Sequence, residues 1–197
     1  MVDSVDPLVK WVQQREAQFR ESAAKEGLLR DRVLRELSGG LWHTTHPDRF
    51  EAILAGGAIL PEPEIPDGER WGTAAGAEHY PYVRTLGGVS LFDFRQFEPE
   101  AYQERCPGST WAYFVPCHLA WECAIWIELD RNQLVPPMFI SGSEVLAKWK
   151  ADGAYGHNFM PEIEAAYIGP ISRTTFKRVF LVRKKNDEFR ELHLPGF

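Results

Sequence analysis

The first group of residues suited to chemistry lies where a short apolar strand, Leu41-Trp42, meets a predicted helix over residues 47–55. Two imidazoles and two hydroxyls stand there in a row, as His43, Thr44, Thr45 and His46. Two histidines at this spacing can approach each other and bind a metal, but the turn offers no carboxylate to support such a site. We therefore expect a polar turn that displays four side chains together, and no metal.

A second group is a pair of carboxylates, Glu162 and Glu164, in the sequence MPEIEAAYIGPI at residues 160–171. If the predicted strand includes both, the two-residue period places them on one face. Glu164 has apolar neighbours in sequence, and a partly desolvated carboxylate is costly unless it binds something. An edge strand with both carboxylates in solvent is the alternative, and the residue pattern leaves both readings open.

Composition narrows the classes of function. The chain has 197 residues and a formal net charge of −6, which disfavours broad, nonspecific nucleic-acid binding because that needs a basic face. We expect no membrane segment and no signal peptide, since Asp3 and Asp6 stand where an apolar leader would lie. Cys117, His118 and Cys123 lack a usual zinc spacing, so we expect reduced thiols in a cytoplasmic protein.

Several common catalytic signatures are missing from the sequence. It contains no GxxxxGK[ST], no GxGxxG, no HExxH and no GxSxG. These absences argue against a P-loop nucleotidase, a Rossmann dehydrogenase, a zincin protease and an α/β-hydrolase.

The first part of the chain is predicted to be helical over residues 6–37. The apolar spacing weakens at residues 22–27, so one long helix and two helices joined at Gly27 are equally consistent with it. We divide the chain into an N-terminal helical appendage, residues 1–40, and a core, residues 41–197. We expect the appendage to pack on the core, and an arm that joins two copies is the alternative.

The core alternates short strands with turns. Residues 61–88 form a long irregular segment in which Arg70 and Arg84 are candidates to meet an anion. Helices are predicted at residues 99–104 and 141–151, and strands at residues 87–94, 110–115, 124–129, 163–168, 176–183 and 189–192. Early helices followed by many strands predict an α+β fold with a mostly antiparallel, split β-sheet.

Three segments in order resemble the motifs of the ADP-ribosyltransferase superfamily, nearest to its poly-ADP-ribose polymerase and DNA-targeting toxin branches. LWHTTHPDRFEAILAGGAIL, residues 41–60, is similar to the first motif, a strand that ends in histidine before a short helix. GGVSLFDF, residues 87–94, resembles the second motif. EIEAAYIGPI, residues 162–171, resembles the third, which carries the catalytic glutamate. The polymerase branch has glycine where this chain has Thr44.

The resemblance implies an NAD site between two small sheets. It assigns Glu164 to the ribose 2′-hydroxyl and to charge stabilisation in the transition state, and Glu162 to orientation of the acceptor. His43 would hold the adenosine ribose, and the remaining NAD contacts would come from Thr44, Thr45, Ser90 and one of the rings Phe92 and Phe94, which would stack on nicotinamide.

The function implied by the resemblance is NAD-dependent mono-ADP-ribosylation of a protein or nucleic acid, as in a bacterial toxin or defence factor. The partners would then be NAD, the acceptor, and an antitoxin or a second copy. One alternative is an RNA 2′-phosphotransferase-like enzyme, which also consumes NAD. It is disfavoured because no basic cluster stands near the first motif in the sequence. A second alternative is a non-enzymatic nucleotide- or protein-binding module, and a third is an α+β domain whose motifs are coincidental.

Overall fold

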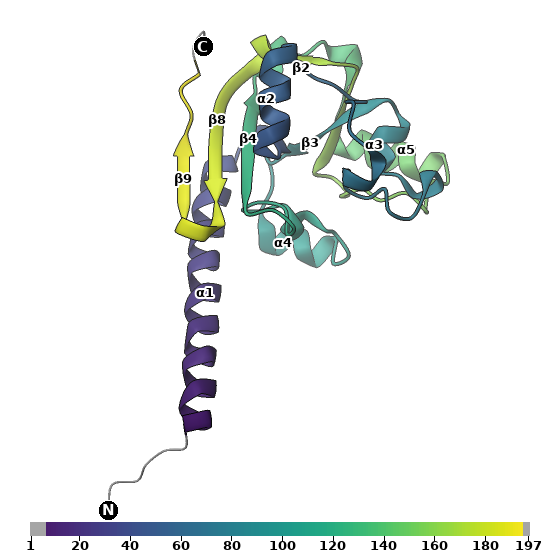
Figure 1. Cartoon of the computed structure of the whole chain (residues 1–197). Helices are drawn as coiled ribbons and strands as arrows, with labels where there is room; N and C mark the ends of the chain where they lie inside the picture. Colours follow the sequence, from purple (N-terminus) through teal and green to yellow (C-terminus); the bar gives the residue numbers. More distant parts are fainter. Residues whose placement is uncertain (1–6, 195–197) are drawn as a thin grey trace, which may run out of the picture.

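A seven-stranded antiparallel sheet forms the centre of the molecule (Figure 1), and the computed structural model describes residues 7–194. The helices are α1 (Pro7–Leu37), α2 (Pro47–Gly56), α3 (Tyr82–Thr85), α4 (Pro99–Arg105) and α5 (Gly142–Ala151). The strands are β1 (Leu41–Thr45), β2 (Ala58–Ile59), β3 (Gly88–Asp93), β4 (Cys123–Leu129), β5 (Phe139–Ile140), β6 (Glu164–Ile168), β7 (Ile171–Ser172), β8 (Phe176–Arg183) and β9 (Glu188–Glu191).

Strand order in the large sheet is β5-β6-β3-β1-β4-β8-β9, and β2 pairs with β7 in a separate two-stranded sheet. Every pairing is antiparallel. The predicted α+β class with an N-terminal helix and a mostly antiparallel sheet is therefore confirmed.

The large sheet opens in its middle, between β1 and β3. These strands pair only at Leu41↔Asp93 and Trp42↔Phe92. Beyond that point β1 continues along β4 as far as Thr45↔Ile125, and β3 continues along β6 as far as Gly88↔Ile168. We call this opening the fork. His43 and Thr44 line one side of it, and Ser90 lines the other.

The two faces of the sheet bury different side chains. One face carries an aromatic core that includes Trp42, Phe92 and Trp126, and the end of α1 covers it. The other face carries a more aliphatic core that includes Leu91 and Ile127, and α2 packs there. Since side chains alternate along a strand, Thr44, Ser90 and Glu164 point to the aromatic face.

Helix α1 is one continuous helix, which settles the choice left open by the sequence. Its last turns pack on the aromatic core through Leu29, Val33 and Leu37, which are buried. Phe19 is 69% exposed and Trp11 is also exposed, and Figure 1 shows the first part of the helix extending away from the sheet. The expected packing of the appendage on the core is therefore found only at the C-terminal end of the helix.

None of the helices in residues 7–194 has the length and the apolar character that a membrane-spanning helix needs.

The prediction of a strand at residues 110–115 is wrong. The segment forms a 3₁₀ turn at Trp111–Tyr113, and the Trp111 side chain is buried and donates to Gln103 Oε1. Phe114 packs against Phe92 and Trp71. Aromatic residues are enriched in strands because they pack well, and here the same packing is achieved by a turn laid over the core.

Gly142, at the start of α5, fits closely against the turn that leads into β6. A Cβ atom on Gly142 would lie 1.9 Å from the carbonyl oxygen of Glu162. We expect Gly142→Ala to lower the free energy of unfolding by about 2–3 kcal/mol, because backbone must move to relieve the overlap. Urea denaturation measures it.

Gly27→Ala is the matched control, since nothing lies within 4 Å of a Cβ atom there. Its position inside α1 predicts a gain of up to ~1 kcal/mol from helix propensity. Equal stability of the two variants would show that the close approach at Gly142 is not a constraint.

Candidate functional site

Glu164 is a buried acid at the fork, and the residue is only 1% exposed. Its Oε1 accepts a hydrogen bond from Ser90 Oγ at 2.6 Å, and its Oε2 accepts one from the backbone N–H of Met160 at 2.7 Å. Burial raises the pKa of Glu164 from 4.5 to about 7, although both hydrogen bonds act to lower it. The group can therefore change its charge near neutral pH.

The strand register explains this geometry. Glu164 is the first residue of β6 and lies opposite Phe92, while Ser90 lies opposite Ala166 on the same face. Ser90 and Glu164 are thus diagonal neighbours on adjacent strands, within reach of each other. The turn before β6 folds back, with the Glu164 N–H donating to the Met160 carbonyl at 2.9 Å, and so brings the Met160 N–H to the carboxylate. This backbone donor leaves no signal in the sequence.

Glu162 does not share a strand face with Glu164, and that expectation is wrong. Glu162 precedes β6 and has a left-handed backbone, with φ of 66°. Its exposed carboxylate forms an ion pair with Arg105 at 3.1 Å. The left-handed residue turns the chain into the strand, so the two acids lie in different surroundings: one buried at the fork, the other at the surface.

His43 bridges the fork. Its Nδ1 lies 3.1 Å from the carbonyl oxygen of Ser90, which can only accept a hydrogen bond, so Nδ1 carries the proton. Burial lowers the pKa of His43, which keeps the ring neutral and leaves Nε2 as an acceptor. The ring thereby satisfies a backbone group where the pairing of β1 with β3 has ended.

Thr44 and Thr45 differ in their surroundings. The Thr44 hydroxyl is buried and has no hydrogen-bond partner within the described residues. If the register of β1 and β3 continued beyond Trp42, Thr44 would lie opposite Ser90, on the same face of the sheet as Glu164. Thr45 is also buried but points to the other face. Hydrogen bonds at the fork therefore join Glu164 to the Ser90 hydroxyl and His43 to the Ser90 carbonyl. Thr44 lies on the face of Glu164, whereas His43 starts from the opposite face, like Thr45.

The rings of Phe92 and Phe94 are part of the aromatic core. Phe92 packs against Phe114 and Trp126, with ring centroids 5.4 and 5.3 Å away, and Phe94 packs against Phe97 at 4.8 Å. Both are buried. Both rings therefore pack within the aromatic core next to the fork.

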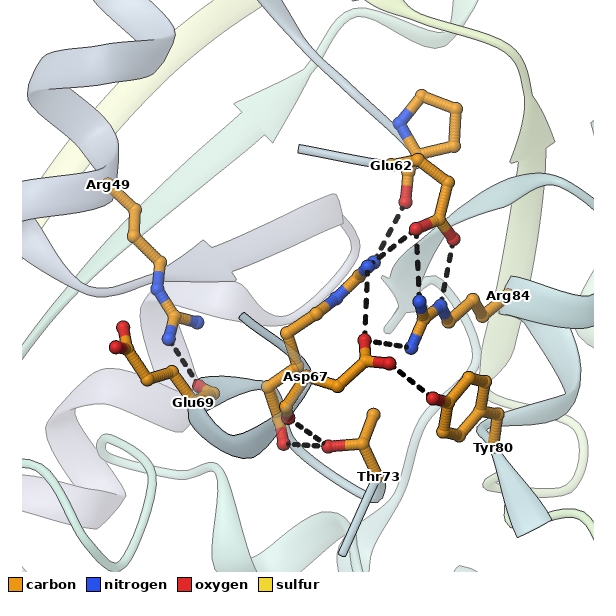
Figure 2. A network of polar contacts seen from close by, with 9 residues as sticks. Arg49, Glu62, Asp67, Glu69, Thr73, Tyr80 and Arg84 are labelled. Carbon is orange, nitrogen blue, oxygen red and sulfur yellow. Dashed lines mark hydrogen bonds and ion pairs between the residues drawn. The ribbon is translucent and has the colours of Figure 1, made fainter. Parts of the chain in front are cut away.

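The two loop arginines do meet anions, but these are carboxylates of their own segment (Figure 2). Glu62 accepts from Arg70 Nη1 at 2.6 Å and from Arg84 Nε at 2.8 Å. Asp67 forms an ion pair with Arg84 at 2.9 Å and accepts from the Tyr80 hydroxyl. The network ties residues 61–88 into an ordered segment and neutralises both arginines.

A different cluster lies at the end of β1 where the chain enters α2. We call it the shelf, and it consists of His46, Arg49, His118, Trp121 and Lys184. Trp121 lies at its centre, with ring centroids 5.6 Å from His46 and 5.1 Å from His118. Arg49 Cζ is 5.9 Å from the centroid of the indole. No pattern in the sequence indicated this basic cluster near the first motif, because its five residues come from three segments that are far apart in the chain.

Among residues 7–194, no three His, Cys, Asp or Glu side chains come together as a metal-ligand set. Comparison of the chain with known protein families and with curated protein sequences finds no match. The functions of the fork and the shelf therefore have to be inferred from their geometry.

The raised pKa of Glu164 has a consequence for stability. The unfolded carboxyl titrates near 4.5 and the folded one near 7, so the stabilisation by the protonated form is complete below pH 4.5 and is lost as pH rises through about 7. Glu164→Gln keeps the shape without the charge. From pH 5 to pH 8, we expect the unfolding free energy of the wild type to fall by about 2–3 kcal/mol relative to the variant.

Urea denaturation of both proteins at the two pH values measures this difference. Parallel pH dependence of the two proteins would show that Glu164 titrates as an ordinary carboxyl.

Proposed function

We propose that the chain is an NAD-dependent mono-ADP-ribosyltransferase that acts on a macromolecular acceptor. The observation that carries the proposal is the buried Glu164 carboxyl, held by Ser90 at the fork beside His43. The resemblance to the three ADP-ribosyltransferase motifs assigns roles to these same residues, and the fold brings them within hydrogen-bond reach although they are far apart in the chain.

Glu164 is suited to stabilise positive charge. A carboxylate has about four lone-pair positions, and Ser90 and Met160 use two of them, so a ribose hydroxyl can donate to another. Positive charge develops on the ribose as the bond to nicotinamide breaks and nicotinamide leaves with the electron pair. The ionised carboxylate in a low-dielectric site lowers the energy of that state. The acceptor nucleophile then bonds to the ribose carbon and loses its proton.

The other fork residues fit a nucleotide that carries hydroxyls and an amide. Nε2 of neutral His43 can accept a hydrogen bond from a ribose hydroxyl. The buried Thr44 hydroxyl has no partner in the described chain, and a ligand group would satisfy it. Glu162 is exposed and paired with Arg105, and in this proposal it would meet the acceptor from solvent.

The shelf favours a second candidate, the RNA 2′-phosphotransferase-like enzyme. The sequence near the first motif lacks a basic cluster and so disfavours this activity, but the fold assembles Arg49, His118 and Lys184 beside His46. NAD-dependent loss of phosphate from an RNA with an internal 2′-phosphate would identify this activity.

The first test is nicotinamide release from NAD by the purified protein. We expect Glu164→Gln to reduce the rate at least ~100-fold, because the variant removes the charge that stabilises the transition state. Chromatography of the reaction, with and without cell extract as acceptor source, measures it.

Glu191→Gln, an exposed carboxylate on edge strand β9, is the matched control and should keep full activity. Wild-type protein that binds NAD without releasing nicotinamide would be a non-enzymatic module. Equal rates for wild type and Glu164→Gln would contradict the assigned role.

Thr44→Val tests the unpaired hydroxyl separately. Because it removes a buried polar group without a partner, we expect the free energy of unfolding to rise by about 1 kcal/mol. If the hydroxyl contacts NAD, the KM for NAD should rise up to ~10-fold. Urea denaturation and steady-state kinetics measure the two effects.

Thr175→Val is the control, since that buried hydroxyl donates to the Ser172 carbonyl at 2.8 Å and its loss should destabilise the fold. An unchanged KM in Thr44→Val would place the NAD contacts elsewhere.

A further inference from the structure

The two cations of the shelf, Arg49 and Lys184, lack carboxylate partners. Within residues 7–194 neither forms an ion pair with Asp or Glu, whereas Arg70 and Arg84 are both neutralised by Glu62 and Asp67. Arg49 Nη2 donates to the Glu69 carbonyl at 2.5 Å, and Lys184 Nζ lies 3.4 Å from the Leu119 carbonyl. Backbone carbonyls orient these groups but leave their positive charge uncompensated.

His118 lies in the positive field of Arg49 and Lys184. Burial lowers the pKa of His118, and the charges of Lys184 and Arg49 lower it further. The one ion pair of a shelf residue with an acid, within residues 7–194, joins His46 Nδ1 to the Asp48 carboxylate at 3.5 Å, and the Asp48 side chain is 88% exposed. The chain has a net charge of −6, which on the whole repels anions. A group of cations without ion-pair partners is therefore where a bound anion gains electrostatic free energy.

The shelf also offers a ring for stacking. Trp121 is half-buried, with His46 edge-on at an interplanar angle of 75° and His118 tilted at 54°. These neighbours hold the indole in one orientation. A planar ring laid on a fixed, partly exposed indole gains stacking energy at little entropic cost. Cations and an indole together match the two parts of a nucleotide: its phosphate and its base.

The shelf adjoins the fork. His46 follows Thr44 by two residues, about 7 Å along an extended chain. On the aromatic face, His118 packs against Phe114 at 5.3 Å, and Phe114 packs against Phe92, which lies opposite Glu164. A ligand on the shelf would therefore extend toward the proposed reacting centre.

We propose that the shelf is a binding site for a nucleoside phosphate, with Arg49 and Lys184 facing the phosphate and Trp121 stacking on the base. Its use in catalysis rests on the proposed function, but the binding itself does not. The nucleoside phosphate comes either from the ADP half of NAD or from a nucleic-acid acceptor, and the two sources share this chemistry.

The test measures the affinity of the full-length protein for ADP and for a twelve-nucleotide single-stranded DNA. Trp121→Ala and Arg49→Gln are compared with Trp11→Ala and Arg15→Gln. The second pair is a matched control, because Arg15 lies 5.4 Å from the Trp11 ring on the exposed part of α1. Calorimetry gives both affinities, and nicotinamide release gives the KM for NAD. Arg49→Gln changes only a partly exposed side chain, so it keeps the test valid if Trp121→Ala does not fold.

We expect the shelf variants to weaken binding about tenfold and the control variants to leave it unchanged. Loss of ADP affinity with a raised KM for NAD identifies NAD as the source. Loss of DNA affinity alone, with the KM unchanged, identifies the acceptor. The proposal is overturned if neither ligand binds, or if the shelf variants bind both as well as the wild type does.

The Glu164→Gln variant separates this proposal from the proposed function. It should bind ADP normally while nicotinamide release is lost. If the wild type releases no nicotinamide but binds ADP through Trp121, the enzymatic proposal fails and the shelf stands.

Discussion

The parting of β1 from β3 is the constraint on which the rest of the site depends. Two strands that stop pairing in the middle of a sheet leave backbone groups that must find other partners or stay unsatisfied at a cost. The His43 ring meets one of these groups, the carbonyl of Ser90, while the Ser90 hydroxyl donates to Glu164. One interruption of the ladder therefore links a histidine, a serine and a glutamate from three strands.

Burial gives Glu164 its chemical character. An ionised carboxylate away from water is costly, and two donated hydrogen bonds compensate for only part of that cost, so its pKa lies near neutrality. Thr44, whose hydroxyl is buried without a partner, adds a second unfavourable group at the same place. Two polar groups held at a cost in one opening are the feature on which the proposal of a ligand site at the fork rests.

Charge is distributed in two ways around the fork. In residues 61–88 each arginine is matched by acids, so these cations hold the loop in place and are not free for a ligand. On the shelf the cations touch backbone carbonyls and rings. The difference between the loop and the shelf decides which of the arginines is available to an anion, and neither the number of arginines nor their position along the chain distinguishes the two sets.

Local pattern was sufficient for most elements. Glycine and proline punctuation with apolar spacing predicted α2, α4 and α5, and the apolar runs predicted β3, β4, β6 and β8, because these signals act between near neighbours. They failed at residues 110–115, where aromatic side chains pack as well on a turn as on a strand, and at Glu162, whose left-handed backbone keeps it outside the start of the strand.

The sequence by itself determined the class of fold and most of its helices and strands, since periodicity and polar breaks are local, while the candidate residues of the fork came from the resemblance of three motifs. The tertiary structure alone decided that β1 and β3 separate, that Glu164 is buried while Glu162 is exposed, and that the Met160 N–H reaches a carboxylate. It also assembled the shelf from distant segments. These features depend on which strands become neighbours and where their pairing ends, and that is a property of the whole sheet.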